Sequence, residues 1–198
     1  ASNNTAVGDS ALNANTTGTQ NTAVGAFALD ANTTASFNTA LGHATLSENT
    51  TGENNTAIGR AALNANTTAS NNTAVGKDAL LSNTTGTRNT AIGSVALDAN
   101  TTADDNTAIG HGALGANTTG TRNIAIGNYA GQSNTTQNDN ISIGYQAFLS
   151  GGTATSYENV AIGSYALKNS TTSSIQNVAI GAQAMEENTT GYRNVAIG

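Results

Sequence analysis

The sequence predicts an all-β fold, a parallel β-roll or β-solenoid in which each turn of the chain forms one rung of 17 residues. A motif, N-x-A-[VIL]-G, recurs through all 198 residues. Large side chains are scarce, with no Trp, three Phe and five Tyr, so a thick enzyme-like core is not expected. A repeat of this length is too short for helical pairs, which need about 33 residues, and suits one solenoid coil.

The motif glycines define the rungs and a single domain over 1–198. Their spacing is 17 residues eight times, then 19, 18 and 17, which gives about eleven rungs. The extra residues fall near 150–153 and 169–174, in predicted turns where insertions disturb registry least. The glycines are Gly8, Gly25, Gly42, Gly59, Gly76, Gly93, Gly110, Gly127, Gly144, Gly163, Gly181 and Gly198.

The first strand of each rung is N-T-A-V-G, in which Thr22 and Val24 share one face and Ala23 and Gly25 the other. Ile or Val replaces Thr in later rungs, for example at Ile124. We therefore expect the Thr and Val columns to face inward. The predicted roll core, including the leucines of a second strand, is Val7, Val24, Leu29, Ile58, Leu63, Val75, Leu80, Ile92, Leu97, Ile109, Ile126, Ile143, Ile162 and Ile180.

A second short strand, Ala-Leu, is predicted to close the core in each rung. The Asn-Thr-Thr-Gly stretch then returns the chain to the next rung, because Asn and Gly tolerate left-handed backbone angles. A helix is the alternative for A-L-x-A-N, but four or five residues are too few for a stable one. The rung is therefore expected to be a flattened, two-layered coil.

The asparagine before each motif is expected to form a hydrogen-bonded ladder along the axis, as in cross-β stacks; a row of ligand-binding amides is the alternative. The ladder comprises Asn4, Asn21, Asn38, Asn55, Asn72, Asn89, Asn106, Asn123, Asn140, Asn159, Asn177 and Asn194. A second column, beginning at Asn15 and Asn32, precedes Thr-Thr and fits the glycan acceptor pattern N-x-T. Turn chemistry explains that column equally well.

The Ala/Gly face is smooth and apolar, and it favours lateral association of identical chains. The motif resembles the head repeats of trimeric autotransporter adhesins (YadA-like) and related repeat arrays of bacterial surface proteins and phage tail fibres. That resemblance implies a left-handed roll and a homotrimeric fibre. It places the three-fold interface at Ala6, Ala23, Ala40, Ala57, Ala74, Ala91, Ala108, Ala125, Ala161, Ala179 and Ala196.

Composition excludes several classes of partner. The net charge of −6, with six scattered Lys and Arg, argues against nucleic acid, and no apolar run approaches a membrane span. Neither His43 nor His111 has a catalytic constellation around it, and four rungs separate them, so we expect no metal site, cofactor or catalytic residue. Both are predicted to be solvent-facing turn residues. The five tyrosines, Tyr129, Tyr145, Tyr157, Tyr165 and Tyr192, are expected to pack in turns and interfaces; a sticky patch is the alternative.

The leading hypothesis is a structural segment of an extracellular trimeric fibre, on a cell surface or a virion tail. It would act as a rigid spacer about 50 Å long, with itself as partner and with multivalent adhesion to host or surface glycans or proteins as a further capacity. We expect a slice of a longer fibre. The alternative is an ice-binding β-solenoid that uses Thr columns such as that of Thr16, Thr33 and Thr50. A glycan-cleaving enzyme is disfavoured because no paired catalytic carboxylates are evident.

Overall fold

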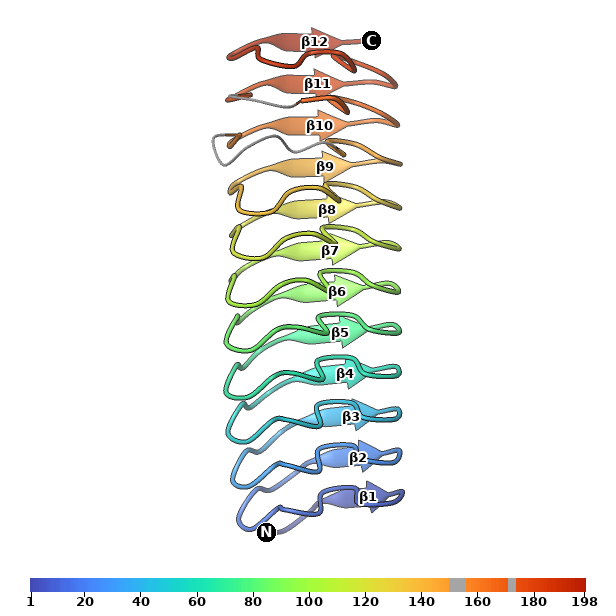
Figure 1. Cartoon of the computed structure of the whole chain (residues 1–198), viewed down its shortest axis with the longest axis vertical. Coiled ribbons are helices and arrows are strands. Elements are labelled where there is room, and N and C mark those ends of the chain that lie inside the picture. Colours follow the sequence, from blue (N-terminus) through green and yellow to red (C-terminus); the bar gives the residue numbers. More distant parts are fainter. Residues whose placement is uncertain (150–155, 171–173) are drawn as a thin grey trace.

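The computed structural model describes residues 1–149, 156–170 and 174–198 and is a β-solenoid in which every rung contributes one strand (Figure 1). The strands form one parallel sheet in sequence order, and each rung is named below by its strand. No helix able to span a membrane occurs in the described part. The strands are β1 (Thr5–Val7), β2 (Thr22–Val24), β3 (Thr39–Leu41), β4 (Thr56–Ile58), β5 (Thr73–Val75), β6 (Thr90–Ile92), β7 (Thr107–Ile109), β8 (Ile124–Ile126), β9 (Ile141–Ile143), β10 (Val160–Ile162), β11 (Val178–Ile180) and β12 (Val195–Ile197).

Every strand pairs in the register that the repeat predicts, so equivalent residues stack directly. Ala23 pairs with Ala40, for example. The register also holds across the longer spacings, because Val160 pairs with Ile141 and with Val178. The predicted insertions themselves fall largely outside the described residues, at 150–155 and 171–173. The strand register is therefore kept across both longer spacings, as predicted.

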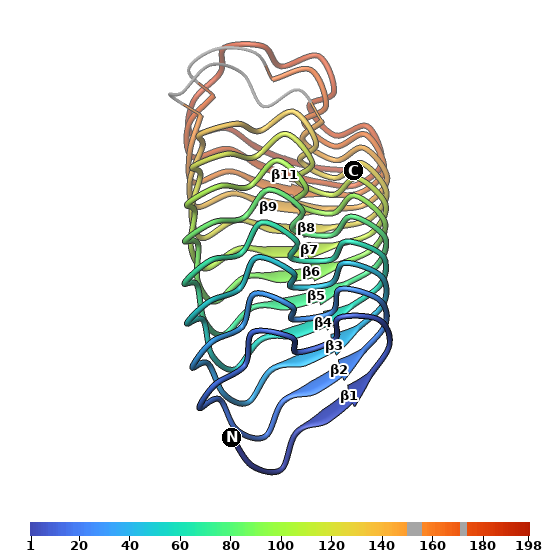
Figure 2. The ribbon, with the colours of Figure 1, turned by 60° about the horizontal axis from the view of Figure 1, so that its bottom comes forward.

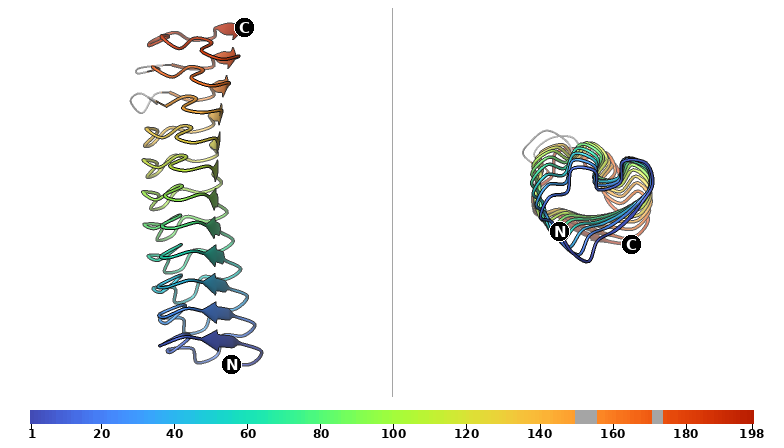
Figure 3. Two further views of the ribbon diagram at one scale, coloured as in Figure 1. Left: turned by 90° about the vertical axis from the view of Figure 1, so that its right-hand side faces the viewer. Right: turned by 90° about the horizontal axis from the view of Figure 1, so that it is seen from below.

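The predicted second strand is wrong, because each rung has one strand and the Ala-Leu segment is a turn. Leu29 has a φ of 51°, in the left-handed region that bulky residues rarely adopt. Its amide donates to the carbonyl of Thr45 in the next rung at 3.1 Å, and its carbonyl accepts from the amide of Asn32 at 3.2 Å. The segment therefore stacks rung on rung without being extended. The rungs overlay when viewed along the axis, with the strands on one side (Figure 3).

The predicted orientation of the strand side chains is also wrong. The alanines point inward and are fully buried within one chain, so they cannot form the predicted interface: Ala23, Ala40, Ala57, Ala74, Ala91, Ala108, Ala125, Ala161 and Ala179. Ala6 and Ala196 pair with Ala23 and Ala179 and keep some exposure because only one neighbouring rung covers each. The inward face of the sheet is thus the alanine face.

The reason for this orientation is the thin interior of the rung. Leucines of the turn wall, such as Leu29, Leu63, Leu80 and Leu97, are fully buried and pack in one cluster with the strand alanines, as predicted for the leucines alone. A small residue opposite each leucine leaves room for it, whereas Val or Ile there would overfill the rung. The β-branched column lies outside instead, where every member is partly or fully exposed: Val7, Val24, Ile58, Val75, Ile92, Ile109, Ile126, Ile143, Ile162 and Ile180.

Each strand ends at a motif glycine that stacks directly on the next one. A Cβ on Gly76, whose φ is +137°, would lie 2.4 Å from the carbonyl oxygen of Gly93. No other residue fits both this angle and this contact. The handedness implied by the resemblance stays a prediction. Figure 2 gives an oblique view of the stacked rungs from the N-terminal end.

Candidate functional site

The outward side chains of β1–β12 form a continuous uncharged strip of apolar and Thr residues, called the outer face below. It consists of two columns, the first and third residues of each strand, and none of the twelve described strands contains a charged residue. Within the single chain, Leu41 is 46% exposed, Ile92 39% and Ile126 37%. Aligned strands in one sheet keep these side chains in straight rows; the left view of Figure 3 shows the stacked strands edge-on.

The first column of the outer face changes character along the axis. It is Thr in the seven strands β1–β7, and Ile or Val in the five strands β8–β12. The third residue is Val, Leu or Ile throughout. With rungs about 4.8 Å apart, the strip is about 50 Å long and on the order of 500 Å² in area, which lies within the range of the largest apolar patches on monomeric proteins.

The predicted asparagine ladder is confirmed and runs beside the sheet. The amide of Asn38 donates to Oδ1 of Asn21 at 2.9 Å, and Nδ2 of Asn38 donates to the carbonyl of Gly52 at 2.9 Å. The same backbone contact continues across both longer spacings, from Asn159 to Asn140 and from Asn177 to Asn159, each at 3.0 Å. These side chains satisfy one another and the backbone, which explains why Asn recurs in every rung.

The second asparagine column forms another ladder in the turn wall. Nδ2 of Asn66 donates to Oδ1 of Asn49 at 2.9 Å and to the carbonyl of Ala69 at 3.0 Å. The chain of amides runs from Asn15 to Asn117, whereas neither polar side-chain atom of Asn134 has a hydrogen-bond partner among the described residues. Because these amides are buried and bonded, turn chemistry accounts for the column and glycan attachment would require the rung to open.

The threonines that follow the second ladder are also used by the backbone. Oγ1 of Thr50 donates to the carbonyl of Thr67 in the next rung at 3.0 Å, and Oγ1 of Thr33 donates to that of Thr50 at 3.2 Å. This is the column that the sequence suggested for ice binding. Its hydroxyl protons are committed within the solenoid, unlike the outward threonines of β1–β7.

The rungs of β1–β8 also alternate in pairs, which gives a 34-residue period that the 17-residue repeat does not predict. The residue after Asn-Thr-Thr is Gly in one rung and Ala or Gln in the next. In the Ala or Gln rung, the following side chain accepts a hydrogen bond from the preceding rung: Ser36 from the amide of Thr19 at 3.0 Å, and Asp104 from that of Thr87 at 2.6 Å. The sequence contains a signal of this pairing, because Gly-Thr in one rung is followed, for example, by Ala-Ser or Ala-Asp at the same position in the next.

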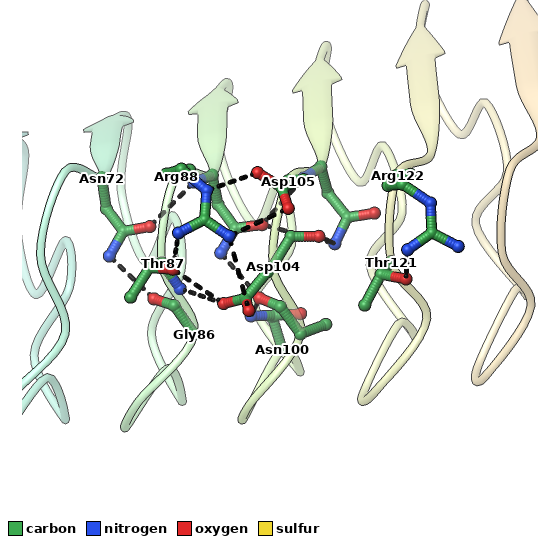
Figure 4. Close-up of polar contacts among 12 residues, drawn as sticks. Asn72, Gly86, Thr87, Arg88, Asn100, Asp104, Asp105, Thr121 and Arg122 are labelled. Carbon is green, nitrogen blue, oxygen red and sulfur yellow. Dashed lines mark hydrogen bonds and ion pairs between the residues drawn. The ribbon is translucent and has the colours of Figure 1, made fainter.

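Ion pairs reinforce two of these rung pairs on the surface, and Figure 4 shows the one between Arg88 and Asp105. Arg88 Nε lies 2.6 Å from Asp105 Oδ1, and Arg122 Nε lies 2.6 Å from Asp139 Oδ1. The hydrogen bond from each arginine lowers the pKa of its aspartate and raises the pKa of the arginine. All four groups are exposed or nearly so, hence each pair contributes little to stability.

The structure places both histidines on the surface, as predicted, each against an aromatic ring. His43 lies edge-on to Phe27 with centroids 5.9 Å apart, and His111 to Tyr129 at 5.0 Å. No group of three or more His, Cys, Asp or Glu residues that could hold a metal occurs in the described part of the chain.

Three of the tyrosines, Tyr129, Tyr145 and Tyr165, lie in turns. Tyr145 and Tyr165 meet edge-on at 5.3 Å, and burial is the main cause that raises the pKa of Tyr165. Tyr157 and Tyr192 each form a parallel bridge with Ile175. Turn packing, the predicted role, is confirmed for Tyr129, Tyr145 and Tyr165, while a role in contacts between chains stays a prediction.

No family model matches this chain, and neither the curated proteins nor the solved structures contain a match. The resemblance to adhesin head repeats therefore rests on the motif alone. The packing of the described residues does not explain the composition of the outer face, which is therefore the candidate functional site.

Proposed function

We propose that the chain is a rigid segment of an extracellular fibre in which three copies pack side by side through the outer face. The observation that carries this proposal is the composition of that face: two apolar or Thr columns, repeated in all twelve strands and free of charge. An apolar strip of this length is unfavourable in water and becomes favourable when another surface covers it. A second copy offers a strip with the same rung spacing.

The geometry supports a role as a spacer. Each added rung extends the stack along one axis, and the backbone amides of neighbouring rungs are bonded on both the strand and turn sides, as at Thr22 to Asn38 and Leu29 to Thr45. Such a coil resists bending because every rung contacts its neighbours over its whole circumference. The function is mechanical, with multivalent adhesion to glycans or proteins arising from repetition of surface groups along the axis.

Native mass spectrometry of the 198-residue chain at micromolar concentration tests the assembly. We expect a trimer, and a monomer would contradict the proposal. Val24→Lys places a charge on the outer face and should dissociate the trimer. Ala26→Lys is the matched control, since it lies in the same rung in a column that already contains Arg60 and Lys77; it should stay trimeric.

Ice binding is the second candidate, and one observation favours it. The threonines of β1–β7 point outward in register beside a row of Val, Leu and Ile, so a flat array of hydroxyl and methyl groups meets water. This array differs from the Thr16-type column that the sequence suggested. Such a face must remain uncovered, so the ice-binding candidate expects a monomer with measurable thermal hysteresis that Thr56→Lys abolishes. A trimer without thermal hysteresis would exclude it.

A further inference from the structure

A notch interrupts the turn wall in the rung of β7, where two glycines replace the side chains of neighbouring rungs. Gly112 stands between Val95 and Tyr129 in its column, and Gly115 stands between Asp98 and Gln132. The resulting cavity has a volume of about 450 Å³ and is lined by Val95, Asp98, Gly112, Gly115 and Gln132, among others. It is separate from the outer face, because these residues belong to turns and not to strands.

The rung of β4 contains the side chain that the notch lacks. Asn64 occupies the position equivalent to Gly115, three rungs earlier. Its Nδ2 donates to the carbonyl of Ala44 at 3.0 Å and to Oγ of Ser47 at 2.7 Å. The residues equivalent to Ala44 and Ser47 at the notch are Val95 and Asp98. At the notch, the carbonyl of Val95 and the carboxylate of Asp98 thus face Gly115, which has no side chain to donate to them.

The distances at the notch agree with this comparison. The point that a Cβ of Gly115 would occupy lies 3.3 Å from Asp98 Oδ1 and 3.6 Å from the carbonyl oxygen of Val95. Among the described residues, no amide donates to the Val95 carbonyl and no cation pairs with Asp98. Burial is the main cause that raises the pKa of Asp98, and the nearby Asp78 adds to it, while its own amide and that of Ala99 lower it.

An aromatic ring forms another side of the notch. Tyr129 Cδ1 and Cε1 lie 2.9 and 3.0 Å from the point that a Cβ of Gly112 would occupy. In the rungs of β10 and β11 the same wall holds an ammonium between such groups: Lys168 Nζ lies 4.5 Å from the ring centroid of Tyr165 and 3.8 Å from Glu186 Oε1. A tyrosine beside a carboxylate is therefore already used by this chain to hold a cation.

We propose that the notch binds a primary ammonium group supplied by a ligand. Its N–H groups would donate to Asp98 and to the Val95 carbonyl, as the amide of Asn64 does in its own rung, with the Tyr129 ring alongside. At the notch, Asp98 supplies a carboxylate where Ser47 supplies a neutral hydroxyl in the rung of β3. A cation should therefore bind at the notch more strongly than a neutral amide. The net charge of −6 also favours cationic ligands. The amine of a lysine side chain and that of an amino sugar share this chemistry.

Titration of the full chain with small amines, followed by ¹H–¹⁵N NMR, tests the proposal. The probes are propylamine, N-acetyl-lysine amide, glucosamine and tetramethylammonium. Primary amines should shift the amides of Gly112 and Gly115, and tetramethylammonium, which has no N–H to donate, should bind at least about tenfold more weakly. The tighter of N-acetyl-lysine amide and glucosamine identifies the source of the amine. Equal binding of tetramethylammonium, or no shift with any amine, would overturn the proposal.

Three variants make the test specific. Gly115→Asn restores the side chain found at Asn64 and should abolish amine binding by filling the notch. Asp98→Asn keeps the shape and should weaken binding about tenfold or more by removing the charge. Asp30→Asn is the matched control. Asp30 is equivalent to Asp98 four rungs earlier, and Ser47 occupies the place next to it that Gly115 occupies next to Asp98. This variant should leave the affinity unchanged. Unchanged affinity in Gly115→Asn or Asp98→Asn would overturn the proposal.

Discussion

The rungs of β1–β7 and those of β8–β12 follow one repeat with different strictness. In the first region the outward column is Thr and the second asparagine ladder is continuous up to Asn117. In the second region that column is Ile or Val, two spacings lengthen to 19 and 18 residues, and Asn134 lacks side-chain partners among the described residues. Both regions keep the strand register and the first asparagine ladder.

The comparison separates what the fold requires from what it tolerates. The motif glycine, the buried alanine position and the asparagine beside the strand recur in every rung, with Ser142 as the one exchange at the alanine position. They fix the distance and register between rungs. The turn ladder and the outward column vary, so they adjust stability and the chemistry of the outer face. Two predictions test this division, and two more concern charged groups of the turns.

The largest expected effect is on the turn ladder. Asn66→Ala removes three hydrogen bonds, two that Nδ2 donates and one that Oδ1 accepts from Asn83. Buried partners are left unsatisfied, so the substitution should lower the free energy of unfolding by about 2–4 kcal/mol. Asn134→Ala removes a side chain that has no partners and should change it by less than about 1 kcal/mol. Urea unfolding followed by circular dichroism measures both. Equal effects would show that the two regions do not differ as described.

The outward column should control association. Thr73→Ile makes β5 resemble the second region and should strengthen the proposed trimer by about 1 kcal/mol per copy, because more apolar surface is buried. Ile141→Thr makes β9 resemble the first region and should weaken it by a similar amount. Sedimentation equilibrium over a dilution series measures the two shifts, and shifts of the same sign would refute the idea.

Asp98 should destabilise the folded chain slightly at neutral pH. Its pKa is raised in the folded state, so folding disfavours the ionised carboxylate and the penalty disappears as the pH falls and the group is protonated. Asp98→Asn should therefore be more stable than the parent chain at pH 7 and equal to it at low pH. Thermal unfolding at both pH values checks this, and a stability gap that widens on acidification would argue against it.

The smallest effect is expected from the surface ion pairs. Asp105 and Asp139 have lowered pKa values in the folded state, so their contribution is present above the ordinary carboxyl pKa of about 3.9 and is lost as the pH falls below it. Arg88→Ala should lower the midpoint of thermal unfolding slightly at pH 7 and low salt. In high salt the difference from the parent chain should vanish, and it should shrink as the pH falls through the lowered pKa of Asp105.

Much of the fold was predictable because repetition reveals the rung directly. The glycine spacing predicted the register, the recurrent leucines predicted the buried column, and the asparagines predicted a ladder. Which face of the strand points inward was not predictable from Thr-Ala-Val, since both faces are weakly polar or apolar. Exchange of Thr for Ile was interpreted as burial, although an outward face accepts the same exchange.

The narrow interior of the rung determines which strand face points inward, because only a small residue fits opposite the leucines. That width depends in turn on the conformation of the turn wall. Leu29 and its equivalents adopt left-handed angles that their residue type disfavours, so propensity predicted an extended strand there instead. The notch at Gly112 and Gly115 was likewise hidden, because two glycines among 22 give no signal until the columns are stacked in space.

Thiol labelling tests most directly whether copies of this chain cover the outer face. The chain has no Cys, so each single-cysteine variant reports one site. Ile92→Cys lies on the outer face, Ala91→Cys in the interior and His43→Cys on the exposed turn wall. We predict that Ala91→Cys and Ile92→Cys are both protected in the native assembly, while His43→Cys reacts rapidly. Labelling of Ile92→Cys at the rate of His43→Cys would mean that the outer face meets only water, and would contradict the account.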